Sequence, residues 1–227
     1  MRELSADAMS IFAKYGASVL FITFTANPKC PEIIENLRPS EQTTDRPDLL
    51  ARVFNLKLKS LMDDLTVHGA FRKSIAHVCT IEFQKHGLPH ADILILLLAD
   101  DKFSPSECID KFLRAEIPSS TENPRLHEIV TKCLMHRPCG IDNLGAPCME
   151  AGQCKKMFPK EFQTETTMNV SGYLLYRRRP SGDTAFVGGR EMDNRFVVPY
   201  NPYLLLKYNT HIKVEVCTSL ECGEIYL

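Results

Sequence analysis

The stretch of sequence that decides the fold runs from Thr80 to Ile95 and reads TIEFQKHGLPHADILI. Apolar and polar residues alternate through its first part, as they do along a half-buried strand. Gly87 and Pro89 then mark a turn, and a second, more continuously apolar segment follows. These features predict a β-hairpin whose second strand lies at the centre of a sheet that is covered by helices.

Three side chains that can ligate a metal lie in this predicted hairpin. If residues 85–89 form the loop, Gln84 lies opposite His90, and Glu82 lies opposite Asp92. Side chains alternate between the faces of a strand, so the imidazole and both carboxylates project to one side. Facing carboxylates repel each other unless a cation neutralises them, and this ligand set suits Mn²⁺ or Mg²⁺. The alternative is an edge hairpin whose polar side chains face water.

Composition limits the remaining possibilities. The chain has 227 residues, 44% of them hydrophobic and 24% charged, which is enough for a sizeable core. Its net charge of −1 means that any affinity for nucleic acid must come from local patches. The longest apolar run, 93–99, is far shorter than the ~20 residues of a membrane span, so no membrane association is expected. The nine cysteines follow no secretory signal and predict reduced thiols in an intracellular protein.

The other patterns predict an α+β fold. A β-branched and aromatic segment at 18–24 reads as a strand, and an amphipathic helix begins at Pro47. We therefore expect an antiparallel central sheet with helices packed mainly on one face, together with a Cys-rich loop and a C-terminal β-hairpin region. Two further helices are expected at 105–114 and 124–135, and two further strands at 173–178 and 195–199.

A second group of metal ligands has the spacing His136-x2-Cys139-x8-Cys148-x5-Cys154. Four nitrogen and sulfur ligands within about twenty residues, in a loop that contains three glycines, are typical of a closed structural zinc site. Cys133 is an alternative first ligand if the segment before His136 is helical. The other interpretation is a loop with scattered buried cysteines.

Two basic clusters could contact DNA phosphates without reading sequence. The first cluster directly follows Cys154, the last cysteine of the second ligand group, and the second lies in a predicted strand. Solvated surface charge is the alternative for both. The residues are Lys155, Lys156 and Lys160 in the first cluster, and Arg177, Arg178 and Arg179 in the second.

Four segments, taken in order, resemble the replication-initiator (Rep) endonuclease domain of Helitron rolling-circle transposons, which is also called the Helitron helicase-like domain. The first block reads FITFTANPKCPEI, and the family usually has a tryptophan where this chain has Cys30. The second block is the histidine–hydrophobic–histidine hairpin, the third is the Cys-rich middle, and the fourth approaches the catalytic tyrosines. These segments are 21–33, 81–94, 136–160 and 194–205.

The resemblance implies an enzyme that nicks one strand of single-stranded DNA. In such enzymes a metal polarises the phosphate while a tyrosine attacks it and forms a 5′-phosphotyrosine. Carried over to this chain, the metal residues are Glu82, His90 and Asp92. The family normally has a second histidine where Asp92 stands, which puts normal nicking in doubt. The location would be nuclear if the protein acts on genomic DNA.

The C-terminal end departs further from the family. Two tyrosines normally follow the segment that matches 214–217, and only Tyr226 could replace the first of them, one position out of register. The chain has no P-loop, so the ATP-driven helicase of the family is not expected here. The resemblance implies a fragment of a transposon reading frame, cut at both ends.

Two hypotheses follow for this chain. One is a Helitron-type Rep endonuclease domain, degenerate in its chemistry; the other is a non-catalytic, transposon-derived remnant that keeps the fold and binds DNA or zinc. In either case we expect three parts: a Rep-like core with the metal hairpin at 1–115, a helical and Cys/His-rich segment at 116–165, and a C-terminal hairpin with the approach to the tyrosine motif at 166–227.

Overall fold

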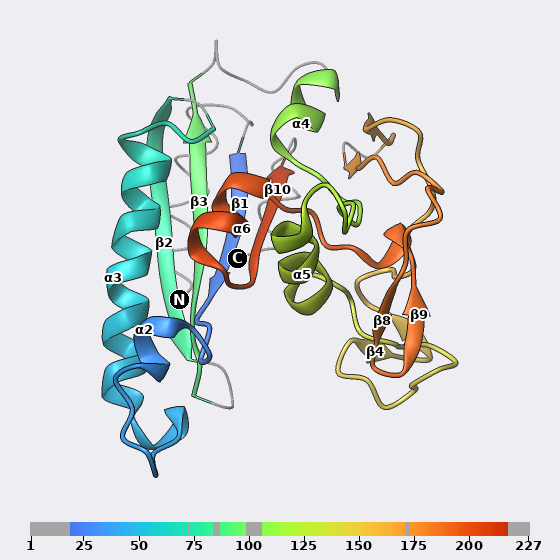
Figure 1. The fold of residues 1–227 in the computed structure, drawn as a ribbon. Helices are drawn as coiled ribbons and strands as arrows, with labels where there is room; N and C mark the ends of the chain where they lie inside the picture. The colour runs from blue at the N-terminus through green and yellow to red at the C-terminus, as the bar shows by residue number, and fades with distance from the viewer. Residues whose placement is uncertain (1–18, 72, 84–86, 99–105, 171–172, 218–227) are drawn as a thin grey trace.

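The structure is a computed structural model that describes residues 19–71, 73–83, 87–98, 106–170 and 173–217 (Figure 1). This part of the chain contains both helices and antiparallel strands, so the predicted α+β class is confirmed. None of the helices in the described ranges is long and apolar enough to cross a membrane.

A four-stranded antiparallel sheet forms the centre of the molecule, with the strand order β10-β1-β3-β2. The second strand of the predicted hairpin, β3, is an inner strand, as its apolar sequence indicated. It lies between β1 and β2 and is buried along most of its length. The strands are β1 (Val19–Thr25), β2 (Ser74–Phe83), β3 (Pro89–Leu97) and β10 (Ile212–Cys217).

The register of the β2–β3 hairpin differs from the predicted one. Glu82 lies opposite His90, and Thr80 lies opposite Asp92, so the prediction that Glu82 faces Asp92 was wrong. The reason is that Phe83 already pairs with Pro89, which moves the connection to residues 84–88. The shift amounts to two residues, and an even shift leaves every side chain on its predicted face.

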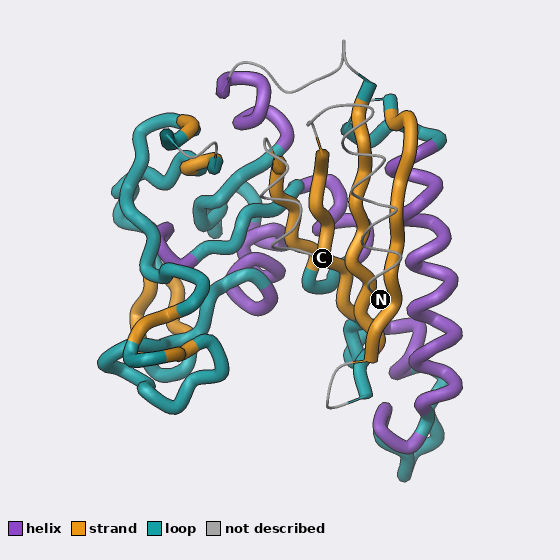
Figure 2. Tube along the Cα trace, turned by 180° about the vertical axis from the view of Figure 1, so that it is seen from behind, coloured by secondary structure: helices purple, strands orange, loops and turns teal. Residues whose placement is uncertain are grey.

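The described helices pack against one face of the sheet, as expected. Their buried side chains join a single core with the face of β1 that carries Leu20, Ile22 and Phe24. Figure 1 shows α3 and α6 on this side, and Figure 2 shows the opposite side, which no described helix covers. The helices are α2 (Pro31–Ile34), α3 (Pro47–Thr66), α4 (Ser106–Phe112), α5 (Pro124–Cys133) and α6 (Pro202–Tyr208), with a 3₁₀ turn η1 at Thr43–Asp45.

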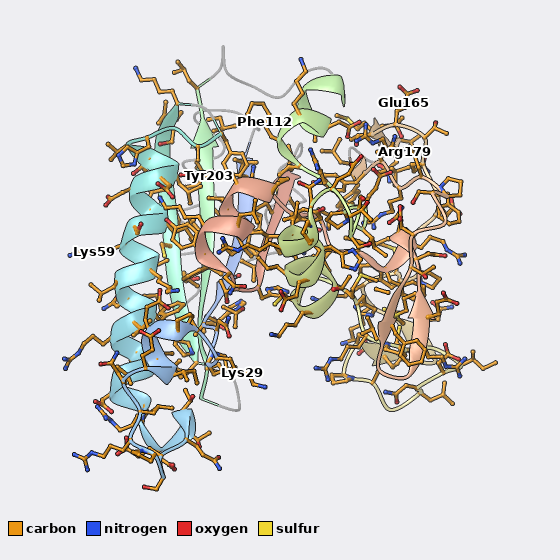
Figure 3. The ribbon with its side chains drawn as sticks, in the orientation of Figure 1. Lys29, Lys59, Phe112, Glu165, Arg179 and Tyr203 are labelled. Carbon is orange, nitrogen blue, oxygen red and sulfur yellow. The ribbon has the colours of Figure 1, made fainter. Side chains whose placement is uncertain are left out.

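Proline at the first position sets the start of α3, because its fixed φ suits a helix and its missing N–H is not needed there. The apolar residues of α3 recur every three or four positions and face the sheet, and Leu50, Phe54 and Leu58 are buried there. Lys59 extends from the opposite side of the helix into solvent (Figure 3). The predicted amphipathic helix at Pro47 is therefore confirmed.

Short hairpins replace the long C-terminal strands that the sequence predicted. Only Leu174–Leu175 of the segment 173–178 forms a strand, and 195–199 begins in a 3₁₀ turn, so both strand predictions were wrong in extent. The C-terminal hairpin instead closes at Gly188 and Gly189, whose positive φ angles suit a two-residue turn. The elements are β4 (Met149–Glu150), β5 (Gln153–Cys154), β6 (Thr167–Met168), β7 (Leu174–Leu175), β8 (Ala185–Val187), β9 (Arg190–Met192) and the 3₁₀ turn η3 (Asn194–Phe196).

A buried carboxylate joins α3 to α6. Lys207 Nζ lies 2.7 Å from each oxygen of Asp64, and the Tyr208 hydroxyl donates to Oδ2 at 2.7 Å. Burial opposes ionisation of Asp64, but the hydrogen bonds from Lys207 and Tyr208 outweigh it and lower the pKa of the carboxyl. The ionised carboxylate therefore stabilises the contact between these two helices.

We expect Asp64→Ala to lower the free energy of unfolding by about 2–3 kcal/mol, because it leaves a buried hydroxyl and an ammonium group without their acceptor. The folded pKa lies below the unfolded one, so this stabilisation is complete above the unfolded pKa and disappears as the pH falls through the folded pKa. Urea unfolding at pH 7 and at pH 3 measures both effects. Asp63→Ala, at the exposed neighbouring position, is the control; equal losses from the two variants would contradict this account.

Candidate metal centre and nucleic-acid face

The four predicted zinc ligands converge. His136, Cys139, Cys148 and Cys154 each offer one ligand atom, and these atoms lie within 4.8 Å of one another. His136 Nε2 is 3.4 Å from the Sγ of Cys139 and 3.6 Å from the Sγ of Cys154. Bonds of ~2.0 Å to nitrogen and ~2.3 Å to sulfur at tetrahedral angles separate such atoms by about 3.5 Å. The cluster could therefore hold a metal such as zinc.

Local backbone geometry brings these ligands together. His136 follows α5, and its N–H donates to the carbonyl of Phe196 at 2.8 Å. The β4–β5 hairpin pairs Met149 with Cys154 and turns at Gly152. Gly152 has a φ of 79°, which residues with a side chain rarely adopt. Cys133, the alternative first ligand, lies in the last turn of α5 and is not part of the cluster.

The electrostatics of the cluster suit a metal ligand set. Burial lowers the pKa of His136, and Lys156 and Lys160 lower it further, so the imidazole is neutral and able to bind a metal. Burial opposes ionisation of Cys154, yet hydrogen bonds from the backbone of Phe158 and Lys156 lower the pKa of its thiol. Cys139 is the opposite case, because burial and hydrogen bonds with the other two thiols raise its pKa to about 12. A bound Zn²⁺ would replace these protons.

A second constellation lies on the sheet face that no described helix covers. Opposed residues share a face, so Glu82 of β2, His90 of β3 and Thr25 of β1 form one row across the strands. The Thr25 N–H donates to the carbonyl of His211 at 3.1 Å, which extends this row to the chain just before β10. The next row contains Thr80, Asp92, Thr23 and Lys213. We call these two rows the polar face.

Hydrogen bonds within the polar face engage both nitrogens of His90. Its Nδ1 lies 2.8 Å from Thr25 Oγ1, and its Nε2 lies 3.2 Å from Asp92 Oδ1. Thr23 donates to the same carboxylate oxygen at 3.0 Å. Burial opposes ionisation of Asp92, but the His90 hydrogen bond outweighs it and lowers the pKa of the carboxyl. Glu82 is exposed, and the structure groups ligand atoms only at His136 and its three cysteines in the part of the chain that it describes. A Mn²⁺ or Mg²⁺ site at the hairpin stays a prediction.

His211 is a residue of this face that sequence reasoning missed. Its Nδ1 is buried and has no hydrogen-bond partner among the described residues. Burial, the nearby His90 and Lys213 lower the pKa of the imidazole to about 4. The signal was available, because His211, Lys213 and Glu215 alternate with apolar residues as they would along a half-buried strand.

The second basic cluster has mainly structural contacts. Arg178 is 3% exposed and donates to three backbone carbonyls, so it has no access to DNA and is not the phosphate contact that the sequence suggested. Arg179 forms a bidentate ion pair with Glu116, with its Nε 2.8 Å from Oε1 and its Nη2 2.7 Å from Oε2. Arg179 is labelled near the upper right of Figure 3. Arg177 lies 3.6 Å from the same carboxylate and 3.4 Å from Asp110.

The first basic cluster is more accessible. Lys155 pairs with Glu150 at 2.9 Å, Lys156 is exposed, and Lys160 is half-buried with its Nζ 5.2 Å from the centre of the Phe158 ring. Contact between these lysines and DNA stays a prediction. Tyr226, the candidate nucleophile, lies outside the described residues.

Comparison with known families identifies the first part of the chain. Residues 1–95 match the family described as the Helitron helicase-like domain at N-terminus. This part of the chain is therefore similar to a Helitron helicase-like domain, and it includes β1, α3, β2 and most of β3 with His90 and Asp92. The match supports a function related to transposons. No curated protein matches the chain.

Proposed function

We propose that this chain is a Helitron-type Rep domain that acts on single-stranded DNA in rolling-circle transposition, with weakened nicking chemistry. The observation that carries the proposal is the His90–Asp92 pair on an inner strand of the matched domain. Threonine hydroxyls and a lysine surround this pair on one face. Groups of these kinds contact the backbone of nucleic acids without reading sequence.

The residues of the polar face have distinct roles in this proposal. Lys213 supplies positive charge for a phosphate, while Thr25 orients the imidazole of His90. Glu82, His90 and Asp92 would hold Mn²⁺ or Mg²⁺, which when bound would polarise the scissile phosphate. Glu82 lies directly across from His90, so a side-chain rotation brings its carboxylate toward the pair.

One observation supports weakened chemistry and favours the second candidate, a non-catalytic remnant that keeps the fold and binds DNA or zinc. Both nitrogens of His90 already have partners, and Asp92 is one of them. A metal would have to displace the Asp92 contact before Nε2 could ligate it. A second histidine at position 92 could not form this ion pair, so the substitution itself closes the ligand site.

The test combines a binding assay with a cleavage assay. We expect the protein to bind a fluorescent oligothymidylate, with an affinity that falls as salt rises. With Mn²⁺ and labelled single-stranded DNA, we expect no covalent adduct on a denaturing gel. Asp92→His is expected to bind Mn²⁺ more tightly than the wild type by titration calorimetry, since it frees Nε2 and adds an imidazole. The control is His68→Ala. His68 is an exposed histidine just after α3, and its Nδ1 lies 3.6 Å from Asp64 Oδ1.

Two results would contradict the proposal. Absence of oligonucleotide binding even at low salt would contradict both candidate functions. A covalent adduct that disappears in Tyr226→Phe would mean that nicking is intact rather than weakened.

A further inference from the structure

We propose that the metal-binding loop, residues 136–160, forms one wall of the single-stranded DNA site. Zinc binding then holds Lys156 and Lys160 of this loop beside Lys213 and His211, where they receive a phosphate. This inference rests on the proposed function and goes beyond it, because it assigns to the Cys/His cluster a role in DNA affinity. The ligand is the phosphodiester backbone of single-stranded DNA.

Both ends of the metal-binding loop are tied to the same short segment. The His136 N–H donates to Phe196 O at 2.8 Å, and the Lys160 N–H donates to Arg195 O at 3.0 Å. Phe196 and Arg195 belong to η3, so this 3₁₀ turn clamps the loop at its first ligand and just after its last one. The loop therefore has a defined place relative to η3.

The same segment is bonded to the sheet. Just after η3, the carbonyl of Pro199 accepts the N–H of Val214 at 3.0 Å, which fixes the segment against β10. The Arg178 guanidinium also binds this segment, because it donates to the carbonyls of Asn194 and Val197 at 2.7 and 2.6 Å. One continuous set of backbone contacts thus leads from the metal-binding loop to the strand that carries Lys213.

The basic groups of the loop and of β10 are close enough to influence one another. Burial lowers the pKa of Lys160, and Arg178 and Lys213 lower it further, while Glu215 opposes them. Lys156 contributes to the lowered pKa of His211. Like charges gathered in this way repel one another, and an anion that binds between them relieves the repulsion.

The described residues supply little to neutralise this cluster. The described carboxylates form no ion pair with Lys156 or Lys160, whereas the adjacent Lys155 pairs with Glu150. Glu215 is the nearest acidic competitor, and it already lies 2.7 Å from Lys213. A phosphate oxygen could accept from both loop lysines.

The metal ligands set the positions of the two lysines. The backbone of Lys156 donates to the Cys154 thiol, so its position follows that of the sulfur. The Phe158 ring stacks on the His136 imidazole with centroids 4.2 Å apart, and the Lys160 ammonium lies 5.2 Å from the centre of the same Phe158 ring. Loss of zinc would release both ligands and with them both lysines.

The experiment measures binding of a fluorescent oligothymidylate to the zinc-loaded and the zinc-stripped protein at several salt concentrations. We expect the double variant Lys156→Ala/Lys160→Ala to keep its zinc and to bind DNA more weakly. Its salt slope should fall by ~0.7, since the two lysines share one phosphate and each phosphate contact on a single strand contributes ~0.7. Stripping zinc from the wild type is expected to cause a loss of the same size. Stripping it from the double variant should cause no further loss.

Controls separate this inference from unfolding and from the proposed function. Lys59→Ala, on the solvent side of α3, should leave affinity nearly unchanged. Lys213→Ala should weaken binding with and without zinc because β10 stays in the sheet. Zinc-independent binding by the wild type, or an equal loss on stripping the wild type and the double variant, would overturn the inference and leave the proposed function standing. Absence of any binding would overturn both.

Discussion

Removal of zinc is expected to release residues 136–160 while the central sheet stays folded. A structural zinc site contributes folding free energy directly, because its ligands are brought together only in the folded, metal-bound state. The two ends of the loop are bonded to η3, and between them its regular structure is the two-residue pair β4 and β5. The freshly purified, reduced protein should contain one zinc per chain by elemental analysis.

Limited proteolysis measures the release. After chelation we expect cleavage within 136–160 well before cleavage in β1 or β3, and Cys154→Ser should show the same pattern together with a loss of zinc. Cys133→Ser is the matched control, because this thiol lies one turn before His136 and outside the cluster. Well under one zinc per chain in the wild type, or equal zinc loss in both variants, would contradict the assignment.

Arg178→Met is expected to lower the free energy of unfolding by about 3–5 kcal/mol. Arg178 is 3% exposed, and its guanidinium donates to the carbonyls of Ala115, Asn194 and Val197, so the substitution takes a hydrogen bond from each of three buried carbonyls. Burial lowers the pKa of Arg178 only to about 10, so the group is charged at neutral pH, and its hydrogen bonds are the stronger, charge-assisted kind.

Urea unfolding at pH 7 tests this expectation, with Arg179→Met as the control. Arg179 is exposed and pairs with Glu116 at the surface, and such pairs typically contribute less than about 1 kcal/mol. If Arg178→Met cost no more than the control, Arg178 would not be the structural centre that its contacts indicate.

The elements with strong local signals could be predicted from the sequence. The periodic apolar residues after Pro47 predicted α3, and the turn residues Gly87 and Pro89 predicted the β2–β3 hairpin. The ligand types and spacing between His136 and Cys154 predicted their convergence. In each case the information lies within a short stretch of chain, where periodicity and spacing are sufficient.

The features that depend on distant contacts could not be predicted. Pairing of β10 with β1 brings together residues far apart in the chain, so the strand that adds Lys213 and His211 to the polar face was missed. The hairpin register depends on where the loop lies, and the loop was predicted at residues 85–89 but lies at 84–88. Arg178 read as surface charge beside Arg177 and Arg179, because sequence does not reveal the three carbonyls that surround it.

The central claim is that single-stranded DNA lies across the polar face and against the metal-binding loop. Photo-crosslinking of the zinc-loaded protein to an iodouracil-substituted oligonucleotide, followed by mass spectrometry of the peptides, tests it most directly. We expect adducts in peptides that contain residues 90–92, 155–160 and 211–213, with those at 155–160 lost when zinc is stripped. Adducts confined to α3 or to residues 177–179 would contradict the account.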